Sequence, residues 1–187
     1  NLNDDAVADG YWGAGDDIIK VGVTYDASYV YLAGDFKKTG TNNLMFLVDF
    51  SSLTGATNTE AHPWNRRYVF NSGDIDLVVE TWGNGLAVWT VTAAGTFTEI
   101  TTDATYAYTG DTSDGGERFI EIAVPWNSLG ITSTDGLQIK YVTSITGGFG
   151  NNNTSQWLGD FAPEQDATST DGSFTPAATI TQFFQVQ

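Results

Sequence analysis

The chain has 187 residues, enough for one globular domain of ordinary size, and 41% of them are hydrophobic, which argues against disorder. It has no cysteine, which excludes disulfides and thiolate metal sites, and seven Lys and Arg against 23 Asp and Glu give a net charge of −16. Such a charge repels phosphate backbones and anionic lipid and therefore argues against nucleic-acid and membrane-surface binding. The longest apolar run, Leu44 to Val48, is too short to span a bilayer.

Short segments in which apolar and polar residues alternate follow one another along the chain, and they predict strands rather than helices. The predicted strands are 21–25, 29–33, 44–48, 68–70, 75–82, 86–92, 97–100, 119–124, 137–145 and 180–186. The segment 44–48 is apolar at every position, which is typical of a central strand covered on both faces. About ten antiparallel strands predict an all-β fold, a two-sheet sandwich of jelly-roll or immunoglobulin-like type, in a single domain over residues 1–187.

The strongest hairpin signal is Gly83-Asn84-Gly85, between two of these strands. A two-residue turn at Asn84-Gly85 would place Glu80 opposite Trp89 and would put Trp82 on the same face. Two indole rings beside a carboxylate offer the apolar surface and the hydrogen-bond acceptors that bind a sugar. The alternative is that Trp82 and Trp89 lie beneath a loop or a second sheet and serve only packing.

Two acidic segments are candidates for a Ca²⁺ site, because carboxylates around flexible glycines provide hard oxygen ligands. The candidate ligands are Asp4, Asp5, Asp9, Asp16 and Asp17 in the first segment and Asp111, Asp114 and Glu117 in the second. Neither segment has the spacing of an EF-hand, and acidic loops that only keep the protein soluble are the alternative.

Residues 146–176 form a long predicted loop rich in Gly, Asn, Thr and Asp, in which Phe149, Trp157 and Phe161 are embedded. A loop of this length in a compact domain is functional or mobile, and its aromatic residues favour a function.

Several segments together resemble the family 9 carbohydrate-binding modules and the wider DOMON-like sandwich group. They are Val21-Gly-Val-Thr-Tyr-Asp-Ala-Ser-Tyr-Val-Tyr-Leu-Ala33, Leu44-Met-Phe-Leu-Val-Asp49 and Phe119-Ile-Glu-Ile-Ala-Val-Pro-Trp-Asn-Ser-Leu-Gly130, in the expected order. The resemblance implies a calcium-binding β-sandwich that is carried by an exported polysaccharide-degrading enzyme or cell-surface protein. Members of the family can hold a sugar between two tryptophans, and Trp157 falls where the later one would lie, with Gln156 and Asp160 beside it. The earlier one is missing, because residues 37–43 contain no aromatic residue.

The sequence therefore predicts a non-catalytic glycan-binding module, secreted or displayed at a prokaryotic cell surface, whose partners are a polysaccharide and catalytic domains of the same polypeptide. Its candidate ligand-binding residues are Trp157, Asp160, Gln156, Trp82, Trp89 and Glu80. The opening Asn1-Leu2-Asn3, without an initiator Met, would suit a processed exported domain and equally a trimmed chain.

Three other functions remain open at this point. A structural subunit of a surface layer or filament could use the apolar segment Ile180–Val186 for strand addition between copies. A haem domain could use Met45 and the single histidine, His62, although a core role for Met45 is favoured. An enzyme ranks last, because carboxylate pairs cannot be recognised from spacing alone.

Overall fold

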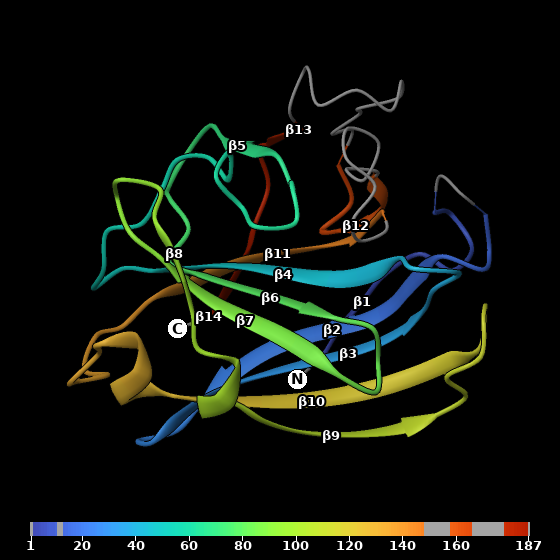
Figure 1. The fold of residues 1–187 in the computed structure, drawn as a ribbon, viewed down its shortest axis with the longest axis horizontal. Coiled ribbons are helices and arrows are strands. Elements are labelled where there is room, and N and C mark those ends of the chain that lie inside the picture. Colours follow the sequence, from blue (N-terminus) through green and yellow to red (C-terminus); the bar gives the residue numbers. More distant parts are fainter. Residues whose placement is uncertain (1, 11–12, 148–157, 166–177, 187) are drawn as a thin grey trace.

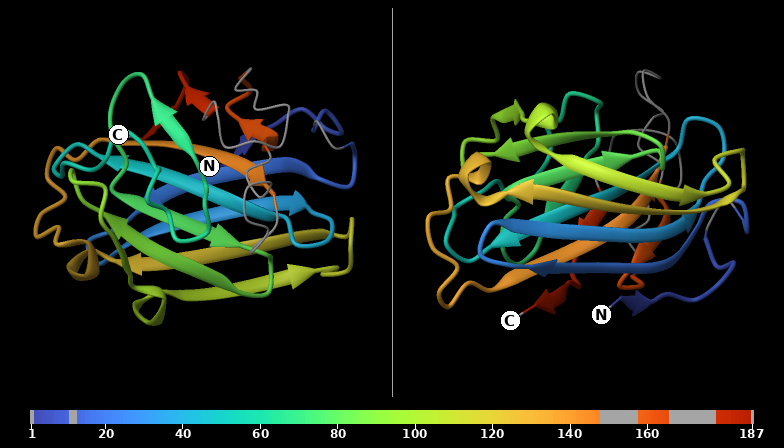
Figure 2. Two further views of the ribbon diagram at one scale, coloured as in Figure 1. Left: turned by 45° about the horizontal axis from the view of Figure 1, so that its top comes forward. Right: turned by 90° about the horizontal axis from the view of Figure 1, so that it is seen from below.

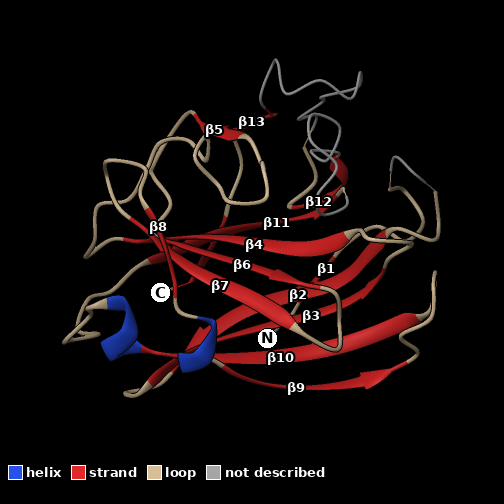
Figure 3. Ribbon diagram, viewed as in Figure 1, coloured by secondary structure: helices blue, strands red, loops and turns tan. Residues whose placement is uncertain are grey.

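A computed structural model describes residues 2–10, 13–147, 158–165 and 178–186 of the chain. Strands make up nearly all of its regular structure, and two short 3₁₀ helices, η1 (Thr101–Asp103) and η2 (Trp126–Leu129), lie at strand ends (Figure 3). The predicted all-β sandwich is confirmed, and the described residues form fourteen strands where about ten were expected.

The smaller of the two main sheets has the strand order β1-β2-β3-β10-β9 and is antiparallel throughout. Its strands are β1 (Asn3–Asp4), β2 (Asp17–Tyr25), β3 (Tyr29–Lys37), β9 (Thr105–Gly110) and β10 (Glu117–Pro125). Every residue of the edge strand β9 is exposed.

The larger sheet has the order β12-β11-β4-β6-β7-β8, and β14 also pairs with β11. Its strands are β4 (Asn43–Phe50), β6 (Leu77–Thr81), β7 (Leu86–Val91), β8 (Phe97–Glu99), β11 (Ile139–Thr146), β12 (Leu158–Ala162) and β14 (Phe184–Val186). The strand β12 lies within the long loop predicted over 146–176, so that prediction is wrong for residues 158–162.

The main core lies between the two sheets, where the inward-facing residues of both alternate with outward-facing ones. Ile18, Leu32 and Ile122 of the smaller sheet and Phe46 and Val88 of the larger sheet are among its buried members.

A third layer covers the outer face of the larger sheet. It consists of the segment 51–76 together with a two-stranded parallel sheet of β5 (Tyr68–Phe70) and β13 (Ala178–Ile180). Figures 1 and 2 show this layer on the side of the larger sheet that faces away from the smaller one. Its apolar residues pack on Met45, Leu47 and Val78 in a second hydrophobic cluster. The prediction that residues 44–48 are covered on both faces is therefore confirmed.

The segment Ile180–Val186, predicted as one strand, is divided between β13 and β14. Those strands already pair with β5 and β11 within the same chain. The prediction of one continuous strand over 180–186 is therefore wrong.

Candidate functional site

The β6–β7 hairpin forms with a different turn from the predicted one. Thr81 pairs with Leu86 and Glu80 with Ala87, so the turn spans residues 82–85 and the Trp82 N–H donates to the Gly85 carbonyl over 3.2 Å. The predicted pairing of Glu80 with Trp89 is thus displaced by two residues. A displacement of two leaves every side chain on its predicted face, so Trp82, Trp89 and Glu80 do share one face of the sheet.

The predicted sugar-binding surface on this face is not open. Trp89 is 3% exposed and Glu80 is fully buried, because the third layer covers them. The assignment of these two residues to ligand contact is therefore corrected, and Trp82, which is half-buried, is the one member of the predicted trio that reaches the surface.

Glu80 instead anchors a buried polar network. Its carboxylate accepts hydrogen bonds from Arg66 Nε at 2.9 Å and Arg66 Nη2 at 3.0 Å, and the Asn43 amide donates to Oε2 at 2.8 Å. Both side chains of the ion pair have zero exposure. The paired guanidinium compensates the buried carboxylate and leaves it no free oxygen for a ligand.

His62 joins this network to a second tryptophan. Its Nδ1 accepts the backbone N–H of Trp64 at 3.1 Å, so the proton of the neutral ring lies on Nε2, 3.6 Å from Glu80 Oε1. Burial lowers the pKa of His62 to about 4, which keeps the ring neutral near pH 7. The ring also packs edge-on to Trp89, with centroids 4.8 Å apart.

Trp64 and Trp82 form the wall of a surface cleft of about 370 Å³. Their ring centroids are 6.4 Å apart at an interplanar angle of 47°, and Trp89 supports Trp64 edge-on from below at 4.8 Å. The remaining lining residues are Lys38, Gly40, Thr41 and Asn43. Trp64 was not predicted as a site residue. It lies in a loop 18 residues before Trp82, and a loop residue shows no alternation of apolar and polar positions that would place it beside a strand.

The loop 38–43, which provides the other lining residues of the cleft, is held by two aspartates that were predicted as metal ligands. Asp16 accepts the Thr39 N–H at 2.8 Å, the Thr39 hydroxyl at 2.5 Å and the Asn42 amide at 2.8 Å. Asp114 accepts the Gly40 N–H at 3.0 Å. Both residues therefore order the loop 38–43, and neither belongs to a group of three or more potential metal ligands among the described residues.

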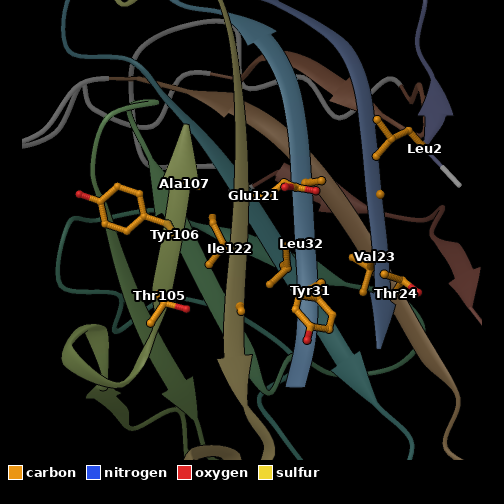
Figure 4. A pocket seen from close by; sticks show the side chains of 13 residues that line it. Leu2, Val23, Thr24, Tyr31, Leu32, Thr105, Tyr106, Ala107, Glu121 and Ile122 are labelled. Atoms are coloured by element: carbon orange, nitrogen blue, oxygen red, sulfur yellow. The ribbon is translucent and has the colours of Figure 1, made fainter. Parts of the chain in front are cut away.

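A second, wider groove of about 560 Å³ crosses the outer face of the smaller sheet, between Leu2 and Tyr106 (Figure 4). Small residues form much of its floor: Gly22, Ala33, Ala107 and Ala123. Tyr31 and Glu121 are its larger polar members, and the Tyr31 hydroxyl already donates to Asp26 at 2.8 Å. This groove has no tryptophan.

Four carboxylates from distant parts of the chain converge beside β2 and β12: Asp5, Asp9, Asp160 and Glu164 each place an oxygen within 4.8 Å of the others. Burial and the neighbouring carboxylates raise the pKa of Asp160 to about 8 and that of Asp5 to about 7. Asp5 Oδ2 is buried without a hydrogen-bond partner. Such a cluster supplies the oxygen ligands that Ca²⁺ prefers. Two of the predicted metal ligands, Asp5 and Asp9, belong to it.

Asp160 was predicted to contact sugar, but its side chain is buried and bonds to backbone N–H groups. It is 6% exposed and accepts the N–H groups of Ile18 at 2.6 Å and Phe161 at 2.8 Å. It therefore fixes β12 to β2 and completes the carboxylate cluster. Trp157 and Gln156, its predicted companions, lie outside the described residues.

The other predicted metal ligands are not members of this cluster. Asp4 is exposed and pairs with Lys20 at 3.1 Å, and Asp17 accepts the Ala8 N–H at 2.6 Å. Asp111 accepts the Ser113 N–H at 2.9 Å in a local turn, and Glu117 is exposed on β10.

A further acidic group, at the far end of β4 from the tryptophan cleft, was not predicted. Asp49, Asp74 and Asp76 place oxygens within 4.8 Å of one another. Burial raises the pKa of Asp76 to about 7, and Lys140 Nζ lies 3.7 Å from Asp49. Within the described residues, these two groups are the clusters of three or more such side chains.

Met45 and His62, considered for haem, are fully and nearly fully buried: Met45 lies in β4 beneath the third layer, and His62 belongs to that layer. Met45 packs in the second hydrophobic cluster, as expected for a core residue.

No protein-family model matches the chain, and no curated protein matches it in sequence. Among the described residues, no helix is both long enough and apolar enough to cross a membrane.

Proposed function

We propose that this protein is a non-catalytic glycan-binding module and that the cleft between Trp64 and Trp82 is its sugar site. The observation that carries the proposal is the pair of half-buried indole rings that meet at the surface. An indole face covers the apolar C–H face of a pyranose, and few other surface groups do so as well.

The rings lie 6.4 Å apart and inclined, which leaves no room for a sugar between them. The sugar therefore stacks on the two rings from outside rather than between them. The exposed Thr41 at the edge of the cleft offers its hydroxyl to the sugar, whereas the buried Lys38 and Asn43 already bond to Gly40 and Glu80 within the protein. A mostly apolar cleft with a few polar groups at its edge is typical of small-ligand sites.

The cleft is also pre-formed. His62 holds the backbone of Trp64, Trp89 supports its ring, and Asp16 and Asp114 hold the loop 38–43. Because these contacts already order the site, binding requires little further loss of conformational freedom.

We further propose that Asp5, Asp9, Asp160 and Glu164 hold a structural Ca²⁺ ion and that the module is exported, with the carrying polypeptide bringing it to a polysaccharide. The close carboxylates and the partnerless Asp5 Oδ2 support the ion. Weak binding by one module becomes effective when it is tethered to a catalytic domain.

The test is a glycan array followed by calorimetry with the strongest ligand. We expect Trp82→Ala and Trp64→Ala each to weaken binding about tenfold or more. The stacking of a sugar on one indole ring contributes about one to a few kcal/mol to the binding free energy. Tyr31→Ala, in the groove on the smaller sheet, is the matched control and should bind as the wild type does.

Absence of any glycan ligand would contradict the proposed function. Loss of binding in Tyr31→Ala with retention in both tryptophan variants would keep the function and move the site to the groove of Figure 4.

A further inference from the structure

The edge strand β9 has a sequence that is the same in both directions. Residues 105–109 are Thr-Tyr-Ala-Tyr-Thr, with Ala107 at the centre. The strand carries no charged residue and no proline in a chain of net charge −16. Natural proteins protect exposed edges with charges, prolines or bulges, and β9 has none of these, so the edge is open to pairing with another strand.

The direction of the backbone groups on β9 follows from its hydrogen bonds to β10. Asp111 N–H donates to the Glu117 carbonyl, and on the other side of β10 the Trp126 N–H donates to Ser28. Backbone groups alternate in direction along a strand, so residues 105, 107 and 109 point toward β10. The N–H and C=O groups of Tyr106 and Tyr108 therefore point out of the sheet edge.

The side chains of Tyr106 and Tyr108 are the largest exposed apolar surface on this edge. They are 45% and 52% exposed, and their rings stack at 24° with centroids 6.5 Å apart. Within the described part of the chain, β10 is the one strand that pairs with β9.

We infer that β9 is a self-association surface, at which two copies of this chain pair antiparallel about a two-fold axis through Ala107. In this register Tyr106 of one copy faces Tyr108 of the other, and each such pair exchanges both N–H···O bonds. Thr105 faces Thr109, and Ala107 faces its own copy as a close, non-hydrogen-bonded pair. In this register the outward N–H and C=O groups of one copy meet those of the other. Tyrosine side chains face tyrosine side chains, and threonines face threonines.

This inference does not rest on glycan binding, because no residue of β9 lines the tryptophan cleft. Asp103 in η1 and Asp111 flank the two ends of β9, so antiparallel pairing brings carboxylates of both copies to each end of the contact. Two carboxylates near each end of the contact weaken the pairing, so the dimer is weak at low ionic strength and strengthens with salt.

The absence of native cysteine gives a direct test of the register. Ala107→Cys places two thiols opposite each other at the axis, at a Cα separation of about 4.5 Å that a disulfide accepts. Under mild oxidation we expect Ala107→Cys to form a covalent dimer. Thr109→Cys is the matched control. It lies on the same exposed edge but faces Thr105 of the second copy, so it should form much less covalent dimer.

Sedimentation of the wild type over about a hundredfold range of concentration measures the same association without a thiol. We expect dimerisation that strengthens with salt. Tyr108→Pro removes one outward N–H and should raise the dissociation constant about tenfold or more, whereas Asp103→Lys should lower it by pairing with Asp111.

A monomer at every concentration and salt level would overturn the inference. So would equal cross-linking of both cysteine variants or a dimer that Tyr108→Pro leaves unchanged. Open-ended polymers rather than dimers would also overturn it, because an isologous contact closes after two copies.

Discussion

At the scale of single residues, alternation along β6 and β7 assigned side chains to faces correctly but did not show which face is covered. Glu80 and Trp89 were expected at the surface and are buried. The signal was present in the neighbouring strand, where Met45 and Leu47 alternate with other apolar residues and require cover on both faces. The layer that covers such a strand also covers the strands beside it. Polar residues of those strands are then buried and need buried partners, as Glu80 has in Arg66.

His62 gives a prediction of pH-dependent stability. Burial lowers its folded-state pKa to about 4, below the value of about 6.5 for an unfolded histidine. Between these values the unfolded chain binds a proton that the folded chain does not, so stability falls as the pH falls from about 6.5 to about 4. The full effect is about 3 kcal/mol.

We expect His62→Gln to remove this part of the acid dependence, because a glutamine can accept the Trp64 N–H and does not titrate. Urea unfolding of both proteins at pH 7 and pH 4.5 measures the difference. If the free energy of unfolding of the two proteins changes equally between these pH values, His62 does not carry the effect.

At the scale of elements, the continuous or alternating apolar runs predicted the central strands well, and β4, β6, β7, β10 and β11 all form near their expected positions. The strands that were missed are exposed or lie in polar sequence. β9 contains only threonine, tyrosine, alanine and glycine, and β12 lies in a segment whose flanks are rich in Gly and Asp. Their partners, β10 and β11, determine these strands, and pairing between distant segments leaves no local pattern.

The hairpin turn between β6 and β7 also depends on a contact with a distant segment that the local sequence does not reveal. Gly83 adopts φ +95°, and a Cβ there would lie 2.3 Å from Cδ of Arg118, whose Nη1 donates to the Trp82 carbonyl at 3.2 Å. The approach of β10 therefore contributes to the choice of Gly83 and Asn84 as the central turn residues in place of Asn84 and Gly85, which are favoured locally.

Gly83→Ala tests this contribution. We expect a loss of about 2 to 3 kcal/mol in the free energy of unfolding, from the positive φ and the displacement of Arg118. Gly95→Ala is the matched control, since Gly95 has φ +75° with nothing within 4 Å of its added Cβ, and it should lose about 1 kcal/mol. Equal losses in urea unfolding would show that Arg118 does not constrain the turn.

At the scale of the whole molecule, the net charge of −16 is distributed unevenly. Asp5 and Asp9 come from the N-terminal segment and Asp160 and Glu164 from near the other end of the chain, so their cluster joins both ends to the sandwich. The acidic first segment was recognised in the sequence as a source of candidate ligands. Which of its carboxylates lie together is determined by the fold. Asp16 and Asp17 point to backbone donors instead.

Without a cation, this convergence destabilises the fold as the pH rises. The folded-state pKa values of Asp5 and Asp160 are raised to about 7 and about 8, so the folded chain holds protons that the unfolded chain releases above about 4. The stability that these protons contribute is present at low pH and is lost as the pH rises through about 7 to 8. A bound Ca²⁺ ion would replace the protons.

We therefore expect CaCl₂ to raise the melting temperature at pH 8 more than KCl of equal ionic strength, since KCl screens charge without occupying the cluster. At a Ca²⁺ concentration about 100 times its dissociation constant, the gain is about 2.7 kcal/mol. Asp160→Asn should abolish the excess over KCl, whereas Asp76→Asn, in the other acidic group, should retain it. An equal response to the two salts in the wild type, or an excess that survives in Asp160→Asn, would show that the four carboxylates do not bind calcium.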